Sequence, residues 1–118
     1  MHELSVANSI LDLVRPYVPE GTPVLAVRVR IGDLSGVVAE SLEFCWTAIV
    51  PETPLRGARL EIEKIPFRVK CEECGEESES SYGLAMCPRC NSARTRVLSG
   101  TEMEVLDIEL SDHPGMRA

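Results

Sequence analysis

The sequence predicts an α+β fold: a small mixed sheet of about three strands with two helices, plus an inserted module that carries four cysteines. Two stretches repeat apolar residues at helical spacing, and three stretches alternate apolar and polar residues as strands do. The 118 residues, 44% of them hydrophobic, are enough to bury one modest core. We therefore expect one domain built from residues 1–69 and 98–118, and a second, inserted domain at residues 70–97.

Each helix is expected from an apolar stripe and a proline that ends it. The first stripe runs from Leu4 to Val14, and Pro16 should end that helix at about residue 15. The second helix follows Gly32-Asp33 and ends before Pro51. Its apolar side is made of Val38, Leu42, Cys45, Trp46 and Ile49. We expect this whole stripe, including the cysteine, to face the core.

The strands are predicted from alternation. Val27, Val29 and Ile31 alternate with two arginines, which indicates a strand with one solvated face. A second strand covers residues 60–69, where the alternation slips and predicts a bulge or bend near Pro66. The last strand covers residues 102–110. Because the insertion leaves one of these strands and returns to the other, we expect the two to lie side by side, with both helices on one face of the sheet.

Four cysteines indicate a metal site within the insertion. They form two C-x-x-C pairs with twelve residues between them: Cys71 and Cys74, then Cys87 and Cys90. Each pair can reach one ion from a tight turn, and two facing turns close a tetrahedral shell of four sulfurs around Zn2+. Gly75 suits the first turn and Pro88 stiffens the second. We predict that residues 70–97 are a zinc-ribbon-like, zinc-binding domain.

The spacing leaves two other interpretations open. A rubredoxin-like iron site needs the same four sulfurs, and two disulfides would use the same pairs. The N-terminus carries no basic run before an apolar stretch, and no apolar run approaches the length of a membrane span. We therefore expect a cytoplasmic protein with no membrane association, in a compartment that keeps thiols reduced and favours metal over disulfides.

Charge and motifs argue against two functional classes. The net charge is −7, and between Arg68 and Arg96 the basic residues are matched by glutamates, so no basic stripe is available for a nucleic acid. The chain also lacks a Ser-His-Asp set, a phosphate-binding loop and a Cys-His pair, so we do not expect an enzyme. A zinc-ribbon adaptor that binds protein or nucleic acid is kept as an alternative function.

The first residues form a possible second metal site. The α-amine of Met1, the amide nitrogen of His2 and the His2 imidazole can form fused chelate rings around a small dication, and Glu3 could add a carboxylate. Ni(II) and Cu(II) suit planar nitrogen sites of this kind. Taken alone, a histidine at position two also fits a mobile terminal residue.

Several segments together resemble the HypA/HybF family of hydrogenase nickel-incorporation proteins. They are the terminal Met-His-Glu-Leu-Ser, Gly32–Val37, Glu40–Phe44, the two cysteine pairs and Gly100-x-Glu102. The resemblance runs from end to end. It implies a small metallochaperone, a monomer or homodimer, that binds Ni(II) at its N-terminus and holds a structural Zn2+ in a separate domain.

The family resemblance also implies roles for residues and partners. The implied nickel ligands are Met1, His2 and, as a neighbour or weak ligand, Glu3. The implied zinc ligands are the four cysteines. Glu40 is a candidate neighbour of the nickel ligands, although it equally fits a solvated helix residue. The implied partners are a HypB-type GTPase and the large subunit of [NiFe]-hydrogenase. Some relatives carry histidines beside the zinc cysteines; this chain has none there, and His113 is expected to be a spectator.

Overall fold

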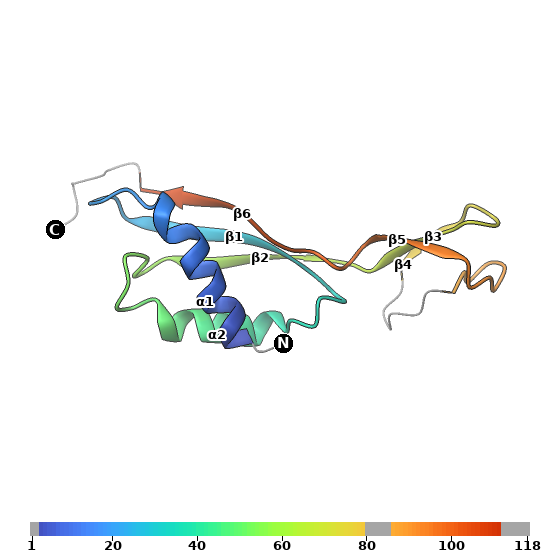
Figure 1. Cartoon of the computed structure of the whole chain (residues 1–118), viewed down its shortest axis with the longest axis horizontal. Helices are drawn as coiled ribbons and strands as arrows, with labels where there is room; N and C mark the ends of the chain where they lie inside the picture. The colour runs from blue at the N-terminus through green and yellow to red at the C-terminus, as the bar shows by residue number, and fades with distance from the viewer. Residues whose placement is uncertain (1–2, 80–85, 112–118) are drawn as a thin grey trace.

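The computed structural model describes residues 3–79 and 86–111, which form two three-stranded sheets arranged end to end (Figure 1). The elements of the main body are α1 (Glu3–Val14), a 3-10 turn (Arg15–Tyr17), β1 (Val24–Gly32), α2 (Ala39–Ile49), β2 (Arg59–Ile65) and β6 (Met103–Leu110). Between β2 and β6 lie β3 (Arg68–Cys71), β4 (Glu77–Glu79) and β5 (Thr95–Ser99). The predicted α+β class is confirmed.

The main sheet has the order β2-β1-β6, with β1 parallel to β2 and antiparallel to β6. The expectation that the second and last strands are neighbours is therefore wrong for this sheet. Both of those strands carry acids on the open face, and like charges directly opposite each other destabilise a strand pair. β1 separates them with its arginines. The two strands become neighbours only in their continuations, where β3 pairs antiparallel with β5.

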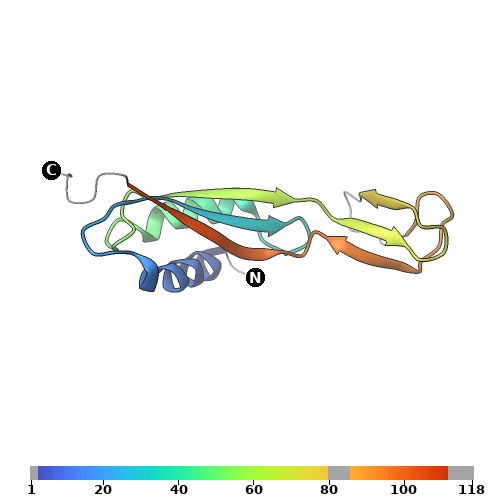
Figure 2. The same ribbon diagram turned by 90° about the horizontal axis from the view of Figure 1, so that it is seen from above.

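Both helices cover the same face of the main sheet, as predicted (Figure 1). Seen from above, α1 lies on the side of β6, and α2 lies on the side of β2 (Figure 2). Their apolar faces meet the inward side chains of β1, of which Val27 and Val29 are at most 1% exposed. Among the residues described, no helix is long and apolar enough to cross a membrane.

The predicted stripe on α2 is correct in its centre and wrong at its start. Leu42 and Trp46 are fully buried, and Cys45 and Ile49 are half-buried against the core. Val38, in contrast, is 54% exposed. It precedes the helix as the N-cap residue with extended backbone (φ −89°, ψ 116°), so its side chain does not follow the helical stripe.

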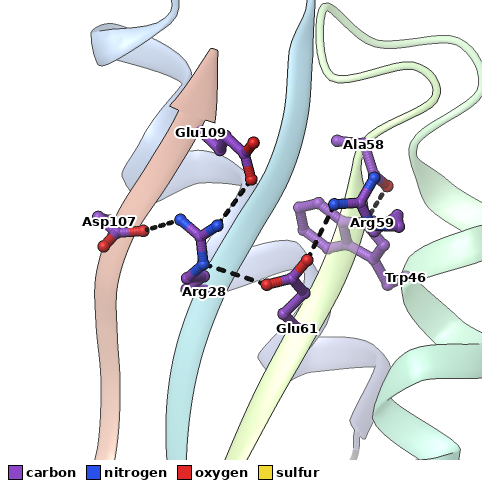
Figure 3. Close-up of polar contacts among 7 residues, drawn as sticks. All are labelled: Arg28, Trp46, Ala58, Arg59, Glu61, Asp107 and Glu109. Carbon is purple, nitrogen blue, oxygen red and sulfur yellow. Dashed lines mark hydrogen bonds and ion pairs between the residues drawn. The ribbon is translucent and has the colours of Figure 1, made fainter. Parts of the chain in front are cut away.

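We expect Trp46→Phe to lower the free energy of unfolding by about 2 kcal/mol. The indole Nε1 donates a buried hydrogen bond of 2.9 Å to the carbonyl oxygen of Ala58, just before β2 (Figure 3). Phenylalanine leaves both a small cavity and an unpaired buried carbonyl. Urea unfolding measures the loss, and Phe44→Leu, at a residue that is 73% exposed, is the control expected to change little. An unchanged unfolding midpoint for Trp46→Phe would contradict the role assigned to this bond.

The open face of the main sheet is covered by ion pairs centred on the two arginines of β1, Arg28 and Arg30. Figure 3 shows the pairs of Arg28. Arg28 donates to Glu61 on β2 (3.1 Å) and to Asp107 (3.0 Å) and Glu109 (2.6 Å) on β6. A hydrogen bond from Arg59 and the charge of Arg28 lower the pKa of Glu61. Because this pKa lies below its ordinary value, the stabilising contribution is present at neutral pH and is lost in acid as Glu61 is protonated.

The predicted bend near Pro66 divides the second strand into β2 and β3. The main body and the second sheet meet at this bend, where Gly32 lies directly against Gly100. A Cβ on Gly32 would fall 2.2 Å from the carbonyl carbon of Gly100, and Gly100 (φ +112°) itself lies against Phe67. The Gly32 amide also donates to the Glu102 carbonyl (2.7 Å). The two sheets are thus joined by close backbone contact.

Candidate metal centre

The structure brings the four predicted cysteines together at the far end of the second sheet. Cys71 ends β3, Cys74 lies in the turn that follows, and Cys87 and Cys90 belong to a second turn before β5. Their four sulfurs all lie within 4.8 Å of one another. The sulfurs of Cys71 and Cys90 are 3.6 Å apart, and those of Cys74 and Cys87 are 3.5 Å apart.

These distances fit four ligands of one ion. Zn–S bonds of about 2.3 Å place the sulfurs of a tetrahedron about 3.8 Å apart. A disulfide, in contrast, needs an S–S distance of about 2.05 Å. The donor set is soft and closed, with no oxygen or nitrogen ligand among the described residues of the cluster, which is the chemistry of a structural site. The cluster can therefore hold a thiophilic metal ion.

The backbone shapes each C-x-x-C turn around its first sulfur. The amides of Glu73 and Cys74 donate to Sγ of Cys71, and the amides of Arg89 and Cys90 donate to Sγ of Cys87, all at 3.4 Å. These four amides compensate negative charge on two thiolates.

A residue with positive φ follows each turn. Gly75 (φ 79°) closes the first turn by donating its amide to the Cys71 carbonyl, as its position in the sequence predicted. Asn91 (φ 62°) does the same for the carbonyl of Cys87. Sequence reasoning missed Asn91, although asparagine is, after glycine, among the residues that best tolerate this conformation.

The thiols of Cys71 and Cys90 differ in their readiness to ionise. The amides of Cys74 and Glu73 lower the pKa of Cys71 to about 7. For Cys90 the amide of Ser92 lowers the pKa, but the thiol of Cys71 and burial together raise it to about 12. The sulfur of Cys71 therefore disfavours ionisation of the Cys90 thiol at neutral pH. A bound dication removes this opposition, because each thiolate then faces a positive charge.

The predicted N-terminal site is described only in part. Met1 and His2 lie outside the described residues. Glu3 begins α1, and its Oε2 accepts a 3.0 Å hydrogen bond from the backbone amide of Val38. Glu40 is exposed in the first turn of α2. It lines a hollow of about 190 Å³ that also includes Asp33 and Lys64. Sequence reasoning had not predicted that Val38 would bond to Glu3 or that Lys64 would line the hollow beside Glu40.

The bond between Glu3 and Val38 fixes the start of α1 against the start of α2. Val38 is the N-cap of α2, so its amide is at the positive end of that helix. The Glu3 carboxylate of α1 accepts the hydrogen bond from this amide. Glu3 therefore lies close to the first turn of α2, which carries Glu40.

The fold and the four-sulfur cluster define a class of small α+β proteins that carry an inserted metal-binding module. Within this class, the family model described as "Hydrogenase/urease nickel incorporation, metallochaperone, hypA" matches residues 1–110. The chain belongs to the HypA family, and the resemblance noted in the sequence is confirmed.

Relatives and solved structures agree with this assignment. The hydrogenase maturation factor HypA of Geobacter metallireducens is 42% identical over 110 residues, covering 93% of this chain and 99% of that protein. That of Desulfatibacillum aliphaticivorans is 35% identical and covers 99% of this chain and 92% of its own length. The solution structure of the Ni metallochaperone HypA from Helicobacter pylori has a TM-score of 0.62 at 23% identity, over 93% of this chain and 97% of that one. At 23% identity, this last similarity shows that the two proteins share a fold.

Proposed function

We propose that this protein binds Ni(II) at its N-terminus and delivers it during maturation of [NiFe]-hydrogenase, and that Cys71, Cys74, Cys87 and Cys90 hold a structural Zn2+. Membership in a nickel-incorporation family over residues 1–110 carries the proposal. The protein acts as a carrier and not as an enzyme. Its partners are a HypB-type GTPase and the large subunit of the hydrogenase, in the cytoplasm.

The two metal sites differ in ways that suit these two roles. The four sulfurs form a closed shell that leaves no open position, so the zinc they hold stabilises residues 70–97 and is not exchanged. The nickel site uses the Met1 amine and the His2 amide and imidazole, with Glu3 beside them. Such a nitrogen site at a chain end is open, so nickel can leave by ligand substitution.

In this proposal Glu3 acts mainly by position. Its Oε2 accepts a hydrogen bond from the Val38 amide, which holds the start of α1 beside the first turn of α2 and Glu40. Residues 1–69 and 98–118 then form the nickel-binding domain, and residues 70–97 form the zinc-binding domain.

Nickel titration of the zinc-loaded protein tests the proposal. We expect the native protein to bind one nickel ion per chain, and His2→Ala to weaken binding by about a hundredfold or more, because the variant loses the imidazole and with it a chelate ring. A residual tag before Met1 should have a similar effect, since it converts the amine to an amide. Isothermal titration calorimetry measures the affinity.

The matched control is His113→Ala, which removes the only other histidine. We expect it to leave nickel affinity unchanged. Nickel binding of native strength in both His2→Ala and the tagged protein, with zinc content confirmed, would show that the cargo site lies elsewhere. If only His2→Ala bound nickel with native strength, the result would show that backbone nitrogens, and not the imidazole, hold the nickel.

A further inference from the structure

The strand β6 forms one edge of the main sheet. Within residues 3–79 and 86–111, β1 pairs with one side of β6 and no strand pairs with the other. β6 is eight residues long. Its outer side therefore presents backbone amides and carbonyls that can add another strand.

An apolar groove of about 290 Å³ runs between this edge and α1. Its walls include Ser9 and Leu13 of α1 and Met103 of β6. Leu13 is 57% exposed and Met103 is 45% exposed. The floor includes Ile10 and Val29, which belong to the buried core. The core of the main domain is thus incompletely covered along β6, since α1 lies beside this strand without closing over it.

The opposite face of β6 is acidic. Glu104 pairs with Arg30 (3.6 Å), and Asp107 and Glu109 pair with Arg28. Glu104 and Asp107 remain 51% and 57% exposed. Both arginines are also shared with acids of β2. The carboxylates of β6 are therefore only partly neutralised and can accept a further cation.

The open face of the sheet consequently alternates in charge from strand to strand. β2 is acidic, β1 is basic, and β6 is acidic. A strand added beyond β6 would place its outward side chains beside Glu104 and Asp107, and its inward side chains over the groove. Opposite charges in such cross-strand positions are stabilising, and like charges are destabilising.

We propose that the outer edge of β6 and the adjoining groove bind an extended segment of a partner protein in which apolar residues alternate with lysine or arginine. The apolar side chains enter the groove between α1 and β6, and the cations reach Glu104 and Asp107. Main-chain hydrogen bonds to β6 provide affinity, and the two sets of side chains provide specificity, as in other cases of strand addition.

The charges argue against a second copy of this chain as the occupant. Pairing of β6 with β6 of another copy would set carboxylates opposite carboxylates, and pairing with β2 would do the same. The basic strand β1 is already paired on both sides. β6 has a register shift opposite Arg28 and Val29, which interrupts its edge and limits the paired stretch to a few residues on either side. We therefore expect a reversible complex of modest affinity.

The groove extends to the start of α1. It begins at Ser5, two residues beyond Glu3. A segment bound here would lie along α1 close to Glu3. This inference does not depend on the proposed nickel function, because strand addition does not itself require nickel.

The experiment uses the full, zinc-loaded chain without nickel and a fluorescent peptide of alternating valine and arginine. We expect saturable binding by fluorescence anisotropy, together with slower hydrogen exchange of amides in β6. A peptide with glutamate in place of arginine should bind at least about tenfold more weakly. Absence of saturable binding by the valine-arginine peptide would overturn the proposal.

Two charge-reversed double variants locate the site. Glu104→Lys with Asp107→Lys should weaken binding of the valine-arginine peptide by about tenfold or more and strengthen binding of the glutamate peptide. The matched control is Glu61→Lys with Glu63→Lys, which removes acids that pair with the same two arginines but lie on β2; it should change binding less than about threefold. Circular dichroism confirms that each variant is folded.

Two outcomes would refute this assignment. Equal weakening by both double variants would show attraction to overall negative charge and no site on β6. Protection of β6 amides that rises with protein concentration in the absence of peptide, together with dimer formation in sedimentation, would show that a second copy occupies the edge.

Discussion

Replacing Cys71 with serine is expected to release zinc and unfold the inserted module, while α1, α2 and the main sheet stay folded. Cys71 is 1% exposed, ends β3 and accepts two backbone amides on its sulfur. Apparent zinc-binding energies of small structural sites are about 10–16 kcal/mol. That exceeds what this module can gain from burial, because among residues 70–79 and 86–97 only Cys71 and Cys87 are buried.

The measurement combines zinc content with amide NMR spectra. Signals of residues 70–97 should collapse toward random-coil positions, and those of β1 and α2 should remain dispersed. Cys45→Ala is the matched control, because this cysteine is half-buried against the main core and is not part of the four-sulfur cluster. Full zinc retention after both Cys71 and Cys90 are replaced would refute the assignment of the ligands.

Gly32→Ala is expected to destabilise the protein by more than about 3 kcal/mol, the second large effect. The added methyl group would lie 2.2 Å from the carbonyl carbon and oxygen of Gly100 and 2.6 Å from the amide nitrogen of Thr101. These are backbone atoms, so no side chain can turn away. The strands on both sides of the junction must separate, which costs the hydrogen bond from the Gly32 amide to Glu102.

Chemical unfolding of the zinc-loaded variants measures this effect. Gly36→Ala is the control: Gly36 has a positive φ of 84°, but no atom lies within 4 Å of its added Cβ. It should therefore cost only about 1 kcal/mol of backbone strain. If Gly32→Ala proved no more costly than Gly36→Ala, the junction would have to be looser than its backbone contacts indicate.

The sequence was sufficient for features that depend on local pattern. The apolar stripes located both helices, alternation located β1, and C-x-x-C spacing identified four sulfurs that do converge. The bend at Pro66 was also evident, because proline cannot donate to a strand ladder. These features are set by residues close to one another in the chain.

The strand order and the details of capping depended on distant contacts. β1 lies between β2 and β6 because its arginines meet acids that are 33 to 81 residues away in the chain. Val38 leaves the apolar stripe because it is the N-cap residue of α2, with extended backbone, and its amide donates to Glu3. These distant contacts cannot be recognised from a stretch of sequence as short as one helix or strand. The roles of Met1 and His2 rest on family membership and remain a proposal.

The pairing of β3 with β5 has a consequence for how the chain folds. β6 can join β1 only after the chain from residue 66 to residue 102 has doubled back. If a metal ion on the four cysteines holds the insertion closed, Arg68 already lies opposite Ser99, and only a few residues on each side remain to be ordered before β6 reaches β1. By loop-closure entropy this shortening corresponds to roughly three halvings of length, or about 2 kcal/mol. A metal ion bound by the four cysteines would therefore shorten the search by which the last strand finds its place beside β1.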